Sequence, residues 1–98
     1  MPTIHINREF ANSRGRYVAH IDDVEGEAEL VFTRHDTDTV SADHTEAPAA
    51  MRGTGAALAL VERLVADARR EHFKIIPRCS YVVAQFKRHV EWADVMAA

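Results

Sequence analysis

Cysteine, proline and glycine are all scarce in this chain, which has one cysteine, three prolines and four glycines in 98 residues. The single cysteine, Cys79, excludes an internal disulfide and suits a reducing compartment. The sequence also lacks internal repeats, low-complexity tracts and interdomain linkers. We therefore expect one domain over residues 1–98, with residues 1–15 as its N-terminal segment, in a cytoplasmic protein.

An excess of positive charge is missing too, since 12 lysines and arginines stand against 15 aspartates and glutamates. The formal net charge of −3 argues against a general nucleic-acid binder, which normally presents a basic surface. The apolar runs are too short and too interrupted to cross a bilayer, and the opening residues, MPTIHINREF, lack a secretory pattern. We expect neither nucleic acid nor membrane as a partner.

Apolar residues make up 47% of the chain, which is enough for a globular core. A core built from so short a chain is modest, so a partner or a dimer interface would add stability. An exposed sheet edge on a small protein can also pair with another chain. We expect a monomer or a weak homodimer.

The first half of the sequence reads as strands separated by polar turns. Ile4 and Ile6 alternate with polar residues and predict an edge strand. Residues 16–22 and 28–34 are rich in β-branched and aromatic residues, with the turn DVEG between them. A third such run, residues 39–47, follows the turn HDTDT and stops before a proline. This half predicts an antiparallel meander.

From Gly53 the periodicity changes to that of a helix. Apolar residues recur at spacings of three and four up to Ala68, with charged residues between them. Residues 73–79 then read as a buried strand, and Ser80 has the residue type of an N-cap for a second helix that runs to Trp92. A strand, helix, strand passage normally closes as a crossover between parallel strands. The sequence thus predicts an α+β fold with a single-layer mixed, mostly antiparallel sheet and two main helices.

Two glycines, Gly53 and Gly55, lie where the first helix must start, directly after Arg52. The first turn of a helix has unpaired N–H groups and the positive end of the helix dipole, so it attracts anions. Glycines let the loop direct its N–H groups toward one point and let a phosphate approach closely. The pattern favours a diphosphate site; the alternative is that the glycines only relieve a tight turn.

Three motifs in order carry a resemblance to a known family. RGTGAA at residues 52–57 fits the signature Arg/Gln-x-x-Gly-x-Gly/Ala, HTEAP precedes it at residues 44–48, and PRCSYV follows the helix at residues 77–82. Over residues 16–94 the chain resembles the GNAT superfamily of N-acetyltransferases. It is most similar to the small, minimal YjdJ-type branch, which has a cysteine in the active-site region.

This resemblance implies an N-acetyltransferase that takes acetyl from acetyl-coenzyme A (acetyl-CoA) and passes it to an amine of a protein or a small molecule. The pantetheine arm is expected to lie between the strands at residues 39–47 and 73–79, alongside Thr45. The acetyl group would then arrive near His44, Glu46 and Cys79. The residues expected to hold the diphosphate are Arg52, Gly53, Thr54, Gly55, Ala56 and Ala57.

Cys79 lies at the end of the expected last strand, just before a helix start. The helix dipole and unpaired N–H groups at such a place lower the pKa of a thiol and raise its thiolate fraction. Cys79 is therefore the leading nucleophile, which would accept acetyl from the thioester and pass it to an amine. Two alternatives stay open: direct attack by the amine with Cys79 only lining the site, or a small buried hydrophobe.

His44 and Glu46 are two residues apart on a strand and so share a face, whereas Thr45 points the other way. Either could take the proton that an ammonium must lose before it attacks, and a histidine titrates in the right range without help. The alternative for His44 is a structural histidine bonded to a turn. The remaining histidines show no ligand spacing, so we expect no metal site.

One position departs from the family pattern. Many GNAT enzymes have a tyrosine in the last helix that protonates the leaving coenzyme thiolate, but Phe86 stands in that region and Tyr81 is the only tyrosine nearby. The short turn DVEG also replaces the helices that shape an acceptor cleft in longer members. Both features keep a second function open: a non-catalytic CoA or acyl-CoA binding module that acts through a protein partner.

Overall fold

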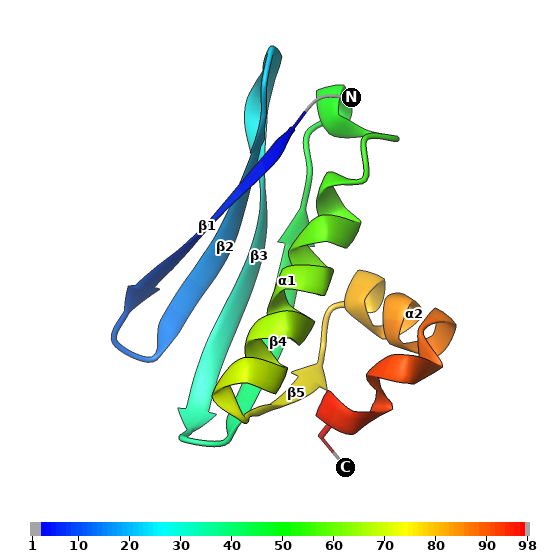
Figure 1. Cartoon of the computed structure of the whole chain (residues 1–98). Coiled ribbons are helices and arrows are strands. Elements are labelled where there is room, and N and C mark those ends of the chain that lie inside the picture. Colours follow the sequence, from blue (N-terminus) through cyan, green and yellow to red (C-terminus); the bar gives the residue numbers. More distant parts are fainter. Residues whose placement is uncertain (1–2, 98) are drawn as a thin grey trace.

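The computed structural model describes residues 3–97, so residues 1, 2 and 98 of the expected domain lie outside the described part. The chain folds into a sheet with helices against it (Figure 1). The longest helix has 16 residues, and no helix in residues 3–97 is long and apolar enough to cross a membrane. In chain order the elements are β1 (Ile4–Ala11), β2 (Arg14–Ile21), β3 (Val24–Asp36), β4 (Thr39–Glu46), the 3-10 helix η1 (Ala49–Met51), α1 (Ala56–Glu71), β5 (Lys74–Pro77), α2 (Ser80–Arg88) and the 3-10 helix η2 (Val90–Val95).

The five strands form one sheet in the order β1-β2-β3-β4-β5. β1 to β4 pair antiparallel as a meander, and β5 returns parallel to β4 after the crossover through α1. The predicted α+β fold, with its mixed and mostly antiparallel sheet and two main helices, is confirmed.

The core fills the side of the sheet on which the helices lie. α1 runs across this side (Figure 1), and its Leu60 and Leu64 belong to the same buried cluster as Leu30 and Phe32 of β3. Trp92 of η2 joins this cluster, so the C-terminal segment closes the core beside β5. Within residues 3–97, no helix covers the opposite face of the sheet, which we call the outer face.

One charged group is buried in the core. Asp67 of α1 is fully buried; its Oδ2 accepts a hydrogen bond from the Tyr17 hydroxyl at 2.7 Å and lies 3.1 Å from an Nη1 of Arg8. Arg63 and Arg70 donate to its other oxygen. Burial, and then the Asp67 carboxylate, raise the pKa of Tyr17, so its hydroxyl keeps the proton that it donates. The cluster ties β1 and β2 to α1.

Three local features differ from the sequence prediction. The turn between β2 and β3 falls at Asp22 and Asp23 rather than over DVEG, because Asp23 adopts the left-handed conformation that aspartate tolerates. Ser80 is the first residue of α2 and not its N-cap, which is Cys79. The second helical stretch is also divided, since α2 ends at Arg88 and η2 follows.

Candidate active site

The candidate site begins where β4 and β5 separate. The two strands pair only from Thr39 to Ala42 on β4. The chain then turns away from β4, and the N–H groups of Arg78 and Cys79 both donate to the carbonyl of Ala42 at 3.0 Å. β4 continues to Glu46 with β3 as its partner on one side and no strand on the other. The last residues of β4 therefore offer a free main-chain edge beside Cys79.

A β-bulge changes which side chains face the helices at this point. Ala42 pairs with Phe32 and His44 with Val31, so Asp43 is the extra residue on β4. Without it, regular alternation from the buried Ala42 would place His44 on the core side. The bulge instead turns His44 to the outer face and places Thr45 on the core side, opposite Leu30.

The loop before α1 adopts the conformation that its glycines allow. Gly53 and Gly55 have φ angles of 77° and 85°, in the left-handed region, and Gly55 is the N-cap of α1. A Cβ atom added at either glycine would meet no atom within 4 Å. The glycines are therefore needed for the backbone conformation, and the space beside them is open.

Some main-chain N–H groups of this loop are hydrogen-bonded within the protein and others are not. The N–H of Thr54 donates to the carbonyl of Met51, and the N–H of Ala56 donates to the Thr54 hydroxyl. Within residues 3–97, the N–H groups of Gly53, Gly55 and Ala57 have no hydrogen-bond acceptor. Three of the five expected donors are thus available to an anion, at the positive end of the helix dipole of α1.

The thiol of Cys79 lies at the N-terminus of α2, where the residue itself is the N-cap. Burial raises the pKa of this half-buried thiol. That effect is outweighed by the Thr45 hydroxyl and by the main-chain N–H groups of Val82, Tyr81 and Thr45, which favour the thiolate, so the pKa of Cys79 falls below its ordinary value. The Sγ of Cys79 and the Oγ1 of Thr45 are 3.4 Å apart.

His44 and Glu46 form a separate pair on the outer face. They stand opposite Val31 and Glu29 in the β3–β4 ladder, and Nε2 of His44 lies 3.5 Å from Oε2 of Glu46. Their side chains are 59% and 71% exposed. The structure therefore brings Thr45, rather than His44 or Glu46, against the thiol.

Comparison with known proteins identifies the family. Residues 16–95 match the family model described as GCN5-related N-acetyl-transferase. The chain belongs to this family. Its fold is similar to the solution structure of a GCN5-like candidate N-acetyltransferase from Staphylococcus aureus, with a TM-score of 0.62 and 23% sequence identity over 94% of this chain and 88% of that one. A comparison with curated proteins finds no match.

GCN5-related N-acetyltransferases generally use acetyl-CoA. The loop before α1 fits the diphosphate of that molecule, because it has unpaired N–H groups and open space at both glycines. Arg52, at the start of the loop, is exposed and adds a positive charge. The free edge at the end of β4 lies beside Cys79, which suits the extended arm of the coenzyme.

Phe86 stands where many GNAT enzymes have a tyrosine, and its side chain cannot donate a proton to the leaving thiolate. Phe86 is buried and packs edge-on against Trp92, with ring centroids 5.6 Å apart. Tyr81 lies in the first turn of α2, and its pKa is raised, chiefly by burial. Its main-chain N–H is among the groups that lower the pKa of Cys79, and its hydroxyl is not. The sequence predicts that N–H groups of this helix start act on the thiol, but it places the N-cap one residue later, at Ser80.

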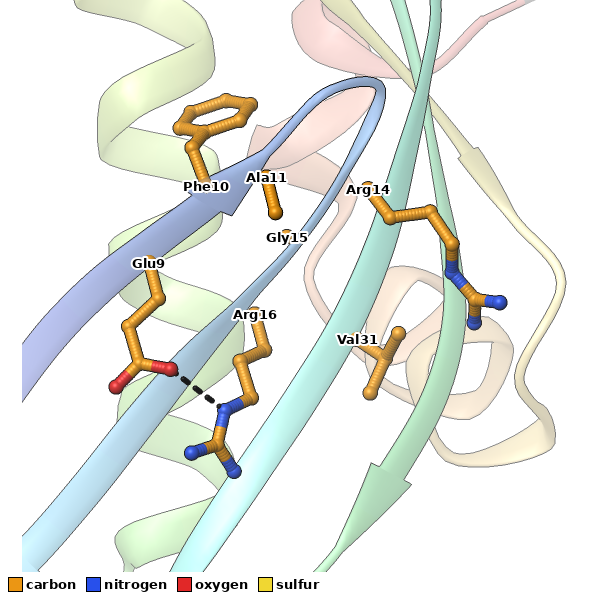
Figure 2. Close-up of a pocket in the computed structure, with 7 residues that line it drawn as sticks. All are labelled: Glu9, Phe10, Ala11, Arg14, Gly15, Arg16 and Val31. Atoms are coloured by element: carbon orange, nitrogen blue, oxygen red, sulfur yellow. Dashed lines mark hydrogen bonds and ion pairs between the residues drawn. The ribbon is translucent and has the colours of Figure 1, made fainter.

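A hollow lies away from the thiol, on the hairpin of β1 and β2. Figure 2 shows this hollow, with Glu9 and Arg16 paired at 2.8 Å and Val31 of β3 beside them. It measures about 420 Å³ and is lined by Glu9, Phe10, Ala11, Arg14, Gly15, Arg16 and Val31. A smaller hollow of about 240 Å³ is lined by Glu27, Glu29, Glu46 and Pro48. Among residues 3–97, no three His, Cys, Asp or Glu side chains form a group that could hold a metal ion.

Proposed function

We propose that this chain transfers acetyl from acetyl-CoA to an amine through an acetyl-Cys79 intermediate, as a small member of the family close to the YjdJ-type branch. The observation that carries the proposal is the position of the thiol. Its sulfur lies at the N-terminus of α2, 3.4 Å from the Thr45 hydroxyl, and faces the end of β4 that β5 leaves free. A lowered pKa raises the fraction of thiolate, which is the nucleophilic form of cysteine.

Binding of the donor substrate uses the loop and the free strand edge. The N–H groups of Gly53, Gly55 and Ala57 hold the diphosphate, and Arg52 adds its charge. Thr54 shapes the loop, because its hydroxyl donates to the carbonyl of Met51 and accepts from the N–H of Ala56. The pantetheine arm pairs with the main chain of β4 near Thr45 and ends at Cys79.

The transfer has two steps in this proposal. The Cys79 thiolate attacks the acetyl carbonyl carbon, a bond to Sγ forms, and the coenzyme leaves as a thiolate. A neutral amine then attacks the acetyl group on Sγ, the carbon–sulfur bond breaks, and Cys79 is restored as a thiolate. The exchange of one thioester for another is nearly isoenergetic, so the first step needs no further energy source.

The acceptor amine must lose a proton before or during its attack. We assign this proton to His44, with Glu46 stabilising the imidazolium across 3.5 Å. Both side chains are exposed on the outer face, so the acceptor approaches from that side, past the part of β4 beyond Ala42 that β5 leaves unpaired. An open approach suits a protein lysine, an N-terminus or a polyamine as acceptor. The chain itself acts as a monomer or a weak homodimer.

The test is intact mass after incubation with acetyl-CoA. The wild-type chain should gain one acetyl group, and Cys79→Ala should gain none while remaining folded by circular dichroism. Adding an amine such as spermidine or a lysine peptide should remove the acetyl group and sustain CoA release. Equal CoA release by wild type and Cys79→Ala would overturn the covalent route, and binding without any release would leave only a CoA-binding module.

A further inference from the structure

Thr45 of β4 lies against the sulfur of Cys79. In the thiol form, Sγ donates a hydrogen bond to Oγ1 of Thr45 at 3.4 Å. A hydroxyl can accept a hydrogen bond from a thiol and donate one to a thiolate. Thr45 can therefore keep its contact with the sulfur in both protonation states.

The position of Thr45 depends on the bulge at Asp43. This extra residue reverses the alternation of β4, so Thr45 rather than His44 points to the core side. Thr45 stands opposite the fully buried Leu30, which fixes the strand beneath it. Its hydroxyl is thus held against the thiol by strand pairing and does not depend on a flexible loop.

We propose that Thr45 is a positioning residue that orients the Cys79 sulfur and holds it as a thiolate for attack on the acetyl group. This inference rests on the proposed acetyl transfer, and it gives Thr45 a role beyond contact with the coenzyme. Cys79 is the N-cap of α2, while Thr45 contacts its sulfur from β4. The sulfur thus lies between the start of α2 and the end of β4.

The substitution Thr45→Val isolates the hydroxyl. Valine has nearly the same shape and stays β-branched, so it suits a strand, but it cannot donate to the sulfur. Thr45→Ser restores the hydroxyl and loses only a methyl group. Thr39→Val is the matched control, because it makes the same change on β4 at the end away from Cys79.

The experiment measures alkylation of the full chain by iodoacetamide as a function of pH. Cys79 is the only cysteine, so the reaction reports on one thiol. Thr45→Val should raise the pH midpoint of alkylation by about one unit, as loss of a hydrogen bond to the charged form does. Thr45→Ser and Thr39→Val should keep the wild-type midpoint. An unchanged midpoint in Thr45→Val, or an equal shift in Thr45→Ser, would overturn the role of the hydroxyl.

Acetylation by acetyl-CoA, followed by intact mass, separates this inference from the proposed function. A wild type that gains no acetyl group, although Thr45→Val shifts the alkylation midpoint, would overturn the proposed acetyl transfer and support the role of Thr45 in holding the thiolate. If the wild type is acetylated and Thr45→Val keeps both its midpoint and its acetylation rate, the positioning role fails alone. Far-ultraviolet circular dichroism confirms that each variant is folded before either comparison.

Discussion

The Sγ of Cys79 lies 3.4 Å from the Oγ1 of Thr45, although the two residues are 34 positions apart in the chain. This contact exists because β5 leaves β4 after Pro77 and because the bulge at Asp43 turns Thr45 toward the core side. It joins the end of β4 to the start of α2. This junction is where we propose that acetyl is transferred to the thiol.

The first prediction concerns the ionisation of Cys79. Its pKa is lower in the folded than in the unfolded chain, despite partial burial, because the Thr45 hydroxyl and nearby main-chain N–H groups favour the thiolate. The thiolate therefore stabilises the fold above the unfolded pKa, and this contribution is lost as the pH falls through the folded pKa. We expect the free energy of unfolding in urea, compared between wild type and Cys79→Ser, to favour the wild type increasingly as the pH rises from 6 to 9.

The direction in which the stability difference between wild type and Cys79→Ser changes with pH decides this prediction. An advantage of the wild type that shrinks with rising pH would mean that burial dominates and that the folded protein prefers the neutral thiol. Alkylation in the presence and absence of denaturant gives an independent reading, since the folded chain should react with the lower pH midpoint.

The second prediction concerns the buried carboxylate of Asp67. Asp67→Ala leaves Arg8 and the Tyr17 hydroxyl without their buried partner. We expect a loss of about 3–5 kcal/mol in the free energy of unfolding, because removal of one member of a buried pair strands the other. Tyr17→Phe should lose about 1 kcal/mol, the net value of one hydrogen bond.

The control for Asp67 is an exposed ion pair. Asp22 lies 3.0 Å from His5, and both side chains are more than half exposed. Asp22→Ala should change the free energy of unfolding by less than about 1 kcal/mol. Equal losses for Asp67→Ala and Asp22→Ala in urea titrations would refute the structural role of the buried cluster.

The third prediction concerns Gly15, at the hairpin shown in Figure 2. A Cβ atom at Gly15 would lie 2.5 Å from the carbonyl oxygen of Glu9 and 2.6 Å from Cζ of Phe32. We expect Gly15→Ala to lower stability by about 1–3 kcal/mol, as overpacking does, and to disturb the edge-on contact of Phe10 with Phe32. Thermal unfolding should show a clear loss; an unchanged melting temperature would mean that the hairpin can open at no cost.

Most of the fold could be predicted from the sequence because periodicity reports which face of an element is buried. β2, β4 and α1 follow the expected runs closely, and the parallel return of β5 follows from the crossover rule. The short turn at Asp22 and Asp23 was missed, because the glycine of DVEG is the stronger turn signal although it lies within β3.

The candidate site could be predicted only in part. The glycines and Cys79 stood out by residue type, so the loop and the thiol were found. The relation of His44 to the thiol could not be inferred, because a bulge inserts one residue without any change in the local pattern of residue types and reverses the faces beyond it. The placement of His44 and Glu46 on the outer face is the consequence.

The central claim is that the loop before α1 binds acetyl-CoA, and a calorimetric titration tests it most directly. Gly55→Asn is the informative variant, because asparagine tolerates the left-handed conformation while its side chain enters the open space beside the free N–H groups. Arg14→Ala, at an exposed arginine on the β1–β2 hairpin, is the control. We predict saturable binding to wild type and Arg14→Ala, weakened roughly tenfold or more in folded Gly55→Asn, a loss of at least about 1.4 kcal/mol. No binding to the folded wild type, or equal binding to Gly55→Asn, would contradict the account.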